Sequence, residues 1–317
     1  MNKLRFVDVC AGAGGLALGL EGAGFEPALL LDKKQVACET LRLNRPAWNV
    51  LETDLLDFDP TEHQHTYDVD LLSAGLPRVK SSATVARAET EEELRLLEAA
   101  VLLAPSIQPR ALIIENVPGL VESPKFEGVR EFIRKELEHL DYRFRWFVLN
   151  AADFGVPQDR KQGVLVALKK QYFDAFEPPA PTVTQHVPVG TALGRSMAAR
   201  GWPGADAWAA QAISVAPTLV GGSDNRGGAD LGPTGSKKAW ERMRVNGGAL
   251  GNDVPGSGDP VSGMIKLTAA QAALLQSFPE DWQFAGKKTA RYRQIGHASP
   301  PPVGTALGMA VAAALNS

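Results

Sequence analysis

A glycine-rich turn that joins a strand-type run to a helix-type run restricts the fold of this chain more than any other feature. The segment FVDVCAGAGGLALG occupies residues 6–19 and places glycines at positions 12, 14 and 15. Glycine reaches backbone angles that other residues avoid, and the helix that follows presents free N–H groups in its first turn. A strand, a glycine turn and a helix in this order predict the start of an open α/β sheet.

Two residue patterns that are absent from the glycine turn restrict the ligands that it can bind. A dinucleotide fingerprint needs a third glycine at position 17, which is Ala17 here, and no Lys-Ser/Thr pair follows to make a phosphate-binding loop. The GxGG turn suits a nucleoside ligand such as S-adenosylmethionine (SAM) better. Taken alone, the turn leaves open a ligand site, a merely tight turn and, as a further alternative, an NAD enzyme.

Residues 1–175 alternate between strand-type and helix-type patterns. The strand candidates are residues 4–9, 27–31, 69–73, 111–115, 144–150 and 163–168. Helical periods cover residues 16–24 and 34–44, and further helical faces carry Leu94, Leu97 and Val101, and then Val129, Phe132, Ile133, Leu137 and Leu140. This alternation predicts a doubly wound, mostly parallel sheet covered by helices on both faces.

The texture of the sequence changes after about residue 175. Residues 176–260 are rich in Pro, Gly, Ser and Thr and carry few periodic runs, which predicts a smaller, irregular lobe. Helical periodicity returns at residues 268–276 and after Pro300. We therefore expect residues 261–317 to return to the first domain.

Composition excludes several classes of protein. Two cysteines in 317 residues rule out a disulfide framework and a self-contained zinc site, so no metal is expected. The N-terminus does not resemble a signal peptide, and no stretch reaches eighteen apolar residues, which predicts a cytoplasmic protein without a membrane partner. A net charge of −3 gives no global signal for nucleic acid, although one basic face is enough to bind it.

Five segments resemble, in order and spacing, motifs of the DNA (cytosine-5) methyltransferases. They are FVDVCAGAGGLALGLEGAGF (6–25), LIIENVPGL (112–120), LNAADFGVPQDRKQGVLVAL (149–168), LTAAQAALLQSFPEDW (267–282) and RQIGHASPPPVGTALG (293–308). The resemblance implies a SAM-dependent methyltransferase fold, SAM as cofactor and double-stranded DNA with a flipped base as substrate. It also places residues 176–260 where the family keeps its variable target-recognition domain.

The resemblance also locates a departure from the family's chemistry. The family's nucleophile is a cysteine in a loop that reads roughly G-G-P-P-C-Q, and its thiolate adds to cytosine C6. The corresponding segment here is LLSAGLPRVKSS (71–82), which places Arg78 on the nucleophile. A guanidinium stays protonated and cannot add to a ring carbon. Cys10 lies beside the glycine turn and Cys38 mid-helix, and we expect neither to substitute.

Other family positions are retained or replaced. The resemblance makes Glu115 the carboxylate that holds the cytosine edge and Arg160 a catalytic arginine, with Gln158 beside it in the same motif. It assigns the cofactor to Asp8, Cys10, Gly12, Gly14, Gly15 and Asp54, with Asp32 as a further candidate. The family's ribose-binding acidic residue aligns with Leu30, and the loss of this charged partner predicts weakened SAM binding. Gln162, Gln271 and His297 replace a family arginine, glutamate and asparagine.

Basic residues supply the candidates for DNA contact. They are Arg78, Lys80, Lys237, Lys238, Arg242, Lys287, Lys288, Arg291 and Arg293, with Arg244 and Trp240 beside the middle group. Each alone is more typical of a solvated helix face; together they are expected to neutralise phosphates.

The sequence thus predicts a SAM-binding, DNA-binding protein of restriction–modification type, impaired or inactive alone in C5 methylation. It is expected to serve as a recognition partner for an active methyltransferase subunit or as a regulator. The alternative is an active SAM-dependent methyltransferase with altered chemistry on DNA or RNA, since attack on an exocyclic amine needs no cysteine adduct.

Overall fold

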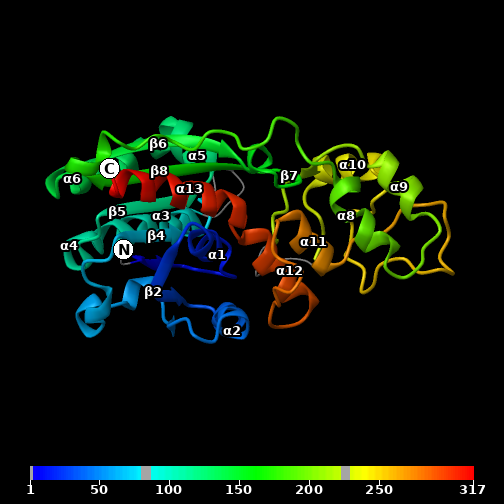
Figure 1. The fold of residues 1–317 in the computed structure, drawn as a ribbon, viewed down its shortest axis with the longest axis horizontal. Helices are drawn as coiled ribbons and strands as arrows, with labels where there is room; N and C mark the ends of the chain where they lie inside the picture. The colour runs from blue at the N-terminus through cyan, green and yellow to red at the C-terminus, as the bar shows by residue number, and fades with distance from the viewer. Residues whose placement is uncertain (1–2, 80–86, 223–228) are drawn as a thin grey trace. The chain divides into compact units, whose positions relative to one another are not determined.

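The structure is a computed structural model that describes residues 3–79, 87–222 and 229–317. The chain divides into two compact units (Figure 1). Unit 1 comprises Met1–Leu149, Lys161–Ala180 and Val303–Ser317, and unit 2 comprises Asn150–Arg160 and Pro181–Pro302.

Unit 1 is built on a seven-stranded sheet with the strand order β3-β2-β1-β4-β5-β8-β6. The strands are β1 (Leu4–Val9), β2 (Phe25–Asp32), β3 (Val50–Glu52), β4 (Leu71–Gly75), β5 (Ala111–Asn116), β6 (Tyr142–Asn150) and β8 (Lys161–Lys169). The pairs β1–β2, β1–β4, β2–β3 and β4–β5 are parallel, whereas β5–β8 is antiparallel. The predicted mostly parallel sheet is confirmed.

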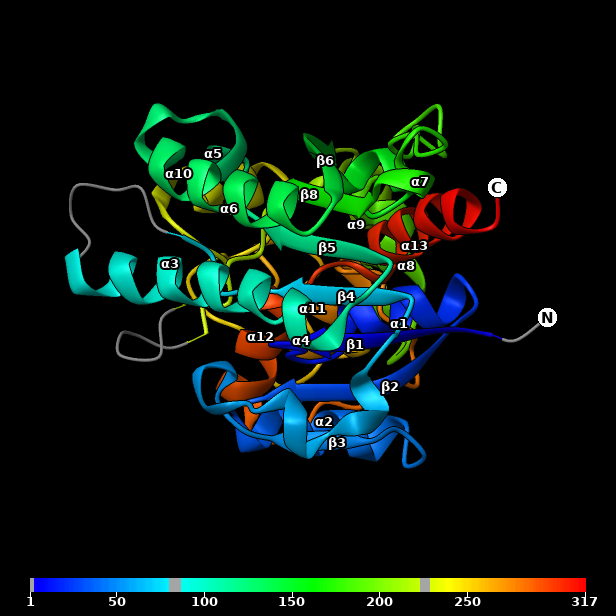
Figure 2. The same ribbon diagram turned by 90° about the vertical axis from the view of Figure 1, so that its left-hand side faces the viewer.

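Helices cover both faces of this sheet (Figures 1 and 2). One face carries α1 (Gly15–Gly22) and α13 (Pro301–Leu315), and the other carries α3 (Arg87–Leu102) and α6 (Glu127–His139). The predicted faces of α3 and α6 are confirmed, because Leu97, Val101, Ile133 and Leu137 are buried in one apolar cluster with the strands. The remaining helices of unit 1 are α2 (Gln35–Asn44), α4 (Ala104–Ile107), α5 (Pro118–Glu122) and α7 (Lys170–Phe173).

Unit 2 is more regular than the sequence predicts. Within residues 176–260, the described part of the chain forms the helices α8 (Val189–Ala198), α9 (Ala205–Gln211) and α10 (Thr234–Arg242). Trp208 and Trp240 are buried, and their indole N–H groups donate to the carbonyls of Met243 (2.9 Å) and Leu231 (3.3 Å). The lobe therefore has a core of its own, and Trp240 belongs to that core. The short strands β7 (Gln158–Asp159) and β9 (Ala216–Pro217) pair in parallel beside it.

The predicted return to the first domain at residue 261 is wrong. Helices α11 (Ala269–Leu275) and α12 (Lys288–His297) belong to unit 2, where α11 packs against α8 and α12. The chain rejoins unit 1 only at Val303. The early segment Asn150–Arg160 also belongs to unit 2, because its buried polar side chains bond to residues far along the sequence.

One stretch in the described part of the chain is long and apolar enough to cross a membrane by length and composition. It is Lys288–Leu315, with a mean hydropathy of 1.2 in its best window, of which 56% is buried. The core helix of a globular protein passes the same test, so this signal is weak.

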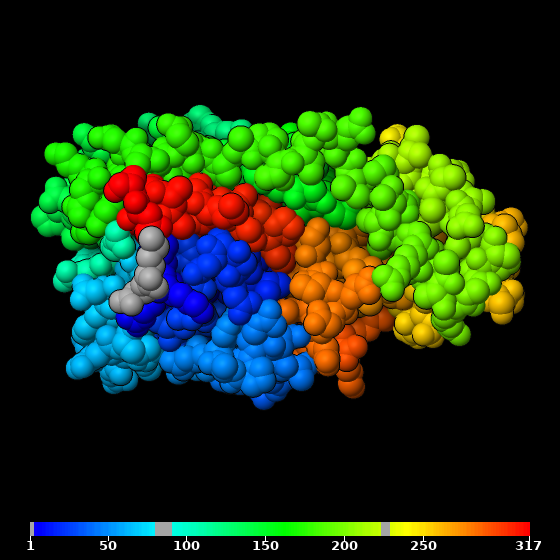
Figure 3. Space-filling model, in the orientation of Figure 1, coloured from blue at the N-terminus to red at the C-terminus, as the bar shows by residue number. Residues whose placement is uncertain are grey.

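Two glycines allow α13 to approach α1 closely (Figure 3). A Cβ atom at Gly304 would lie 3.0 Å from the carbonyl oxygen of Leu16 and 3.2 Å from the Cα of Gly19. A Cβ atom at Gly308 would lie 2.7 Å from the Cβ of Ala23. The Thr305 hydroxyl also donates to the carbonyl of Gly19 at 3.0 Å. The C-terminal helix is thus fitted to the helix that follows the glycine turn.

We expect Gly304→Val to destabilise the protein by about 1–3 kcal/mol, because its side chain meets main chain that cannot move aside cheaply. Thermal unfolding followed by circular dichroism measures the loss. Met309→Val, which places the same side chain at a 61% exposed position of α13, should change stability by only about 0.5 kcal/mol. Equal losses for the two variants would contradict this account of the helix contact.

Candidate active site

The strand order of unit 1 reverses beside β1, since β2 and β3 lie on one side of it and β4 and β5 on the other. In open α/β sheets ligands bind outside the carboxyl ends of the strands at such a switch point. The glycine turn follows β1, Asp32 ends β2, and Asn116 ends β5. Arg78 lies in the loop that follows β4. The fold therefore brings the predicted cofactor and catalytic positions of unit 1 to one edge of the sheet.

The glycine turn is held in an unusual backbone conformation by its neighbours. Cys10, Gly12 and Gly14 have φ angles of 55°, 57° and 83°, and Gly14 forms the N-cap of α1 with no side-chain cap bond. The N–H of Gly12 donates to Asp32 Oδ2 at 2.8 Å, and the N–H of Lys34 donates to Asp32 Oδ1 at 2.8 Å. Asp32 thus ties the glycine turn to the end of β2, while the first turn of α1 stays available to a ligand.

Leu30 and Asp32 occupy different places on β2. Leu30 is fully buried inside β2, in register with Asp8 on one side and Val50 on the other, so its side chain does not reach the strand end. The carboxylate at the carboxyl end of β2 is Asp32, 9% exposed, and burial raises its pKa. Asp32, the further cofactor candidate, is therefore the acidic side chain at this strand end. Weakened cofactor binding stays a prediction.

Asp8 lies within β1 and is completely buried. The Ser73 hydroxyl on β4 donates to Asp8 Oδ1 at 2.5 Å, whereas Oδ2 has no hydrogen-bond partner in the described residues. Burial, with a smaller contribution from the charge of Asp32, raises the pKa of Asp8 to about 7. The carboxyl therefore keeps its proton at pH values where an exposed aspartate has lost it. Ser73 is a partner that the sequence reasoning missed.

Neither cysteine has the properties of a nucleophile. Burial raises the pKa of the Cys10 thiol, and the carboxylates of Asp32 and Asp8 raise it further. Burial raises the pKa of the Cys38 thiol to about 11, and its Sγ donates to the Asp32 carbonyl at 3.4 Å. Because only the thiolate attacks carbon, the raised pKa values argue against either thiol as a nucleophile.

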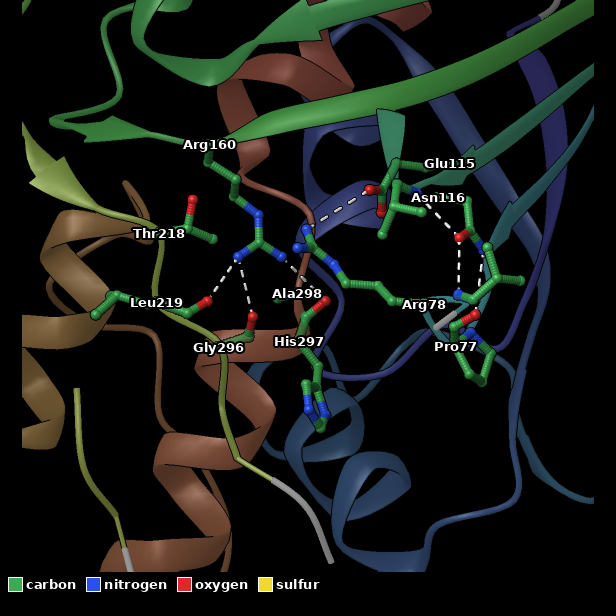
Figure 4. Close-up of polar contacts among 12 residues, drawn as sticks. Pro77, Arg78, Glu115, Asn116, Arg160, Thr218, Leu219, Gly296, His297 and Ala298 are labelled. Carbon is green, nitrogen blue, oxygen red and sulfur yellow. Dashed lines mark hydrogen bonds and ion pairs between the residues drawn. The ribbon is translucent and has the colours of Figure 1, made fainter. Parts of the chain in front are cut away.

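The loop after β4 is fixed by the side chain of Asn116 (Figure 4). Asn116 Nδ2 donates to the Pro77 carbonyl at 3.1 Å, and the N–H of Val79 donates to Asn116 Oδ1 at 3.0 Å. These two bonds bracket Arg78 on either side. Sequence reasoning did not assign Asn116 a role, although it directly follows Glu115 in the matched ENV segment.

Arg78 points at Glu115 from this loop (Figure 4). Its Nη2 lies 3.9 Å from Glu115 Oε1, and the two side chains are 26% and 4% exposed. The guanidinium is thus directed at the carboxylate that the resemblance places on the cytosine edge. Lys80, predicted to add a second positive charge nearby, lies outside the described residues.

Asp54 caps the short 3-10 helix Leu55–Asp57, since Oδ1 accepts from the N–H of Leu56 at 3.1 Å. Its other oxygen pairs with Lys33 Nζ at 3.2 Å. These contacts fix the carboxylate beyond the end of β3; a contact with the adenine of a cofactor stays a prediction.

Arg160, predicted to be catalytic, bonds to the main chain of unit 2. Its side chain is completely buried, and Nη1 donates to the carbonyls of Leu219 (2.9 Å) and Gly296 (3.0 Å) (Figure 4). Nη2 donates to the carbonyl of His297 at 3.5 Å. These bonds fix the guanidinium within unit 2, and a catalytic role for Arg160 stays a prediction.

Other motif positions of unit 2 serve packing in the same way. Gln158 Nε2 donates to Gln276 Oε1 at 2.9 Å, and Gln158 Oε1 accepts from the N–H of Leu219 at 2.8 Å. Gln271 forms a capping box with Thr268 at the start of α11. Nε2 of His297 lies 3.1 Å from the carbonyl oxygen of Gly222. Gln162, which belongs to β8 of unit 1, is completely buried.

The predicted DNA-contacting residues of unit 2 fall on and around α10 and α12. Lys237 pairs with Asp230 at 2.8 Å, Lys288 donates to the Leu250 carbonyl and to Asn252, and Arg291 donates to the Gly286 carbonyl. Lys238, Arg242 and Lys287 are exposed, and Arg293 is half-buried. Several of these cations therefore already have partners within the unit, and DNA contact stays a prediction for all of them.

Comparisons with known proteins agree with this geometry. The family model for C-5 cytosine-specific DNA methylase matches residues 4–313. Type II methyltransferase M.NaeI of Lentzea aerocolonigenes is 43% identical over 320 residues, covering 100% of this chain and 76% of the relative. Type II methyltransferase M.NgoMIV of Neisseria gonorrhoeae is 41% identical over 313 residues, covering 98% and 97%.

Solved structures share the fold. A prophage-encoded E. coli protein described as a DNA modification methyltransferase superposes with a TM-score of 0.69 at 20% identity, covering 99% of this chain and 100% of that one. The Dnmt2 methyltransferase of S. pombe superposes with a TM-score of 0.65 at 17% identity, covering 100% of both chains. At these identities the likeness establishes the SAM-dependent methyltransferase fold.

The raised pKa of Asp8 predicts a pH-dependent cost to stability. Because the folded state holds this proton more tightly than the unfolded chain, Asp8 destabilises the fold progressively as pH rises from about 4 to above 7. We expect Asp8→Asn to gain stability over the native protein across that range, by up to about 4 kcal/mol for a shift of about three pKa units. Thermal unfolding between pH 4.5 and 8 measures the difference. The variant Asp281→Asn, at an exposed position, controls for the loss of one charge. A gain that is the same at every pH would refute this prediction.

Proposed function

The chain belongs to the C-5 cytosine-specific DNA methylase family, and from that membership we propose that it binds SAM and double-stranded DNA but does not methylate cytosine unaided. The observation that supports the proposal is that Arg78, which the resemblance assigns to the family's nucleophile position, points at Glu115 from 3.9 Å. The family is SAM-dependent and of restriction–modification type. Our proposal separates recognition, which is retained, from chemistry, which is lost.

The residues at the carboxyl end of the sheet fit SAM. The glycine turn exposes the N–H groups that open α1, and Asp32 sets a carboxylate beside that turn. Asp8 adds a buried carboxyl oxygen without a hydrogen-bond partner in the described residues. When bound, SAM supplies an activated methyl group. In this chain Asp32 fixes the glycine turn through the N–H of Gly12, and Asp32 and Asp8 provide the carboxyl groups beside it.

The missing step is the activation of the acceptor. Cytosine C5 becomes nucleophilic only after a thiolate has added to C6, and neither Cys10 nor Cys38 has a thiol that ionises at neutral pH. Arg78 offers N–H donors and a positive charge, and a guanidinium has no lone pair to form that bond. Loss of a covalent nucleophile lowers the rate on the order of 10⁶-fold in a hydrolase. Among the described residues at this edge of the sheet we find none that would restore it.

A protein of this kind acts through what it binds. We propose a cytoplasmic DNA-recognition partner for an active methyltransferase subunit, or a regulator that occupies target sites without modifying them. The intact glycine turn and Asp32 favour one alternative, which is methyl transfer to another acceptor in DNA or RNA such as an exocyclic amine. That alternative keeps the donor site and changes only the substrate.

Methyl transfer from radiolabelled SAM separates these outcomes. We expect the purified protein to bind SAM by calorimetry and to shift duplex DNA in a gel at low salt, with no label transferred to DNA or RNA. Transfer by the native protein to a base other than cytosine would establish the alternative. Failure to bind either SAM or DNA would contradict the proposal itself.

Restoring the nucleophile tests the assignment of position 78. We expect Arg78→Cys to raise methyl incorporation into DNA at least about 100-fold over the native protein, a fraction of the 10⁶-fold that a nucleophile supplies elsewhere. Arg78→Ser, which removes the same charge without adding a thiol, is the matched control and should stay inactive. Equal incorporation by the Cys and Ser variants would show that a thiol at position 78 is not what the site lacks.

A further inference from the structure

Two oppositely charged side chains face each other at the end of adjacent parallel strands in unit 1. Glu115 lies on β5, in register with Gly75 at the end of β4, and Arg78 lies three residues beyond Gly75. The Asn116 side chain bonds to Pro77 and Val79, the two residues on either side of Arg78. The backbone that carries Arg78 is therefore fixed from the strand that carries Glu115, and the guanidinium is aimed at the carboxylate (Figure 4).

Both groups have buried atoms that lack hydrogen-bond partners in the described part of the chain. The unpartnered atoms are Arg78 Nε, Arg78 Nη2 and Glu115 Oε1. A separation of 3.9 Å makes Arg78 and Glu115 an ion pair but is too long for a hydrogen bond. Burying a charge is costly unless another group compensates it. Arg78 is therefore the group that compensates the 96% buried carboxylate of Glu115 in the protein without DNA.

The guanidinium of Arg78 resembles in shape the edge of a cytosine that Glu115 would otherwise contact. Arginine presents planar N–H donors on an N–C–N edge, which matches a carboxylate in a forked geometry. The edge of a cytosine that offers its N4 amino group and N3 has the same N–C–N arrangement. A base edge and the Arg78 guanidinium therefore compete for one place beside Glu115.

We propose that Arg78 is a built-in occupant of the base site, which we define as the space beside Arg78 and Glu115, and that it excludes a flipped cytosine. This inference rests on the proposed function. Extruding a base from a duplex costs stacking and pairing, which contacts in an enzyme's site must offset. With Glu115 already compensated by Arg78, that offset is lost. The protein therefore binds its DNA with the target cytosine stacked in the duplex.

A fluorescent cytosine analogue tests this directly. Duplexes that the native protein binds are first enriched from a random pool, and each cytosine of the enriched site is then replaced by pyrrolocytosine, whose emission rises when it unstacks. We expect saturating native protein to leave the emission of every position within about 1.5-fold of free duplex. Arg78→Ala should raise one position several-fold. Arg95→Ala, which removes one arginine at an exposed position of α3, is the matched control and should behave like the native protein.

Two outcomes of this experiment would overturn the proposal. One is an equal rise for native protein and Arg78→Ala at the same cytosine, since the base then enters despite the arginine. The other is no rise at any position for Arg78→Ala, since the arginine is then not what excludes the base.

A second measurement needs no DNA and keeps this inference distinct from the proposed function. Thermal unfolding midpoints of the native protein, Arg78→Ala, Glu115→Gln and the double variant form a cycle that isolates the coupling of the two side chains. We expect the midpoint loss of the double variant to be smaller than the sum of the single losses by about 2 °C or more. Additive losses would overturn the proposed occupancy. Absence of DNA binding alongside clear coupling would refute the proposed function and leave the occupancy standing.

Discussion

Parallel pairing of β1 with both β2 and β4 is the constraint on which the rest of unit 1 depends. Because parallel strands end at the same edge of a sheet, this pairing gathers the glycine turn, Asp32, the loop of Arg78 and the Glu115–Asn116 pair at one edge. No residue of this set needs to be near another in sequence. The side chain of Asn116 then fixes the position of the Arg78 backbone, because it forms hydrogen bonds with the main chain on both sides of Arg78.

The same constraint explains why a cation at position 78 is compatible with the fold. An arginine whose guanidinium is partly buried is costly in apolar surroundings, but here it faces a carboxylate that is itself buried. The charges of Arg78 and Glu115 compensate each other without disturbing the strands, because the hydrogen bonds that shape the loop involve main-chain atoms and Asn116. An arginine at position 78 is therefore compatible with an intact scaffold.

Sequence patterns predicted the elements that local periodicity determines. Buried parallel strands are continuous apolar runs, so β1, β2 and β5 were recognisable, whereas β3 has three residues and no pattern of its own. The family's ribose-binding acidic position aligns with Leu30, two residues before Asp32. Sequence patterns alone do not show that β2 ends at Asp32. The boundaries of unit 2 were missed because they depend on bonds from Arg160 and Gln158 to residues more than fifty positions away, which no local window detects.

The two arginines of the motifs lead to opposite conclusions about what a retained residue means. Arg160 matches the family motif, yet its guanidinium is engaged with the carbonyls of Leu219, Gly296 and His297. Removing it would leave buried carbonyls unpaired, so a protein that needs only to fold must keep it. Retention of Arg160, Gln158 and Gln276 is therefore what the stability of unit 2 requires whether or not the protein is an enzyme. The Arg78 side chain has no such bonds to the main chain in the described residues. The fold therefore does not require an arginine at position 78, and the residue found there bears on chemistry. Activity in our proposal consequently depends on the pair formed by Arg78 and Glu115 far more than on the number of matching motifs.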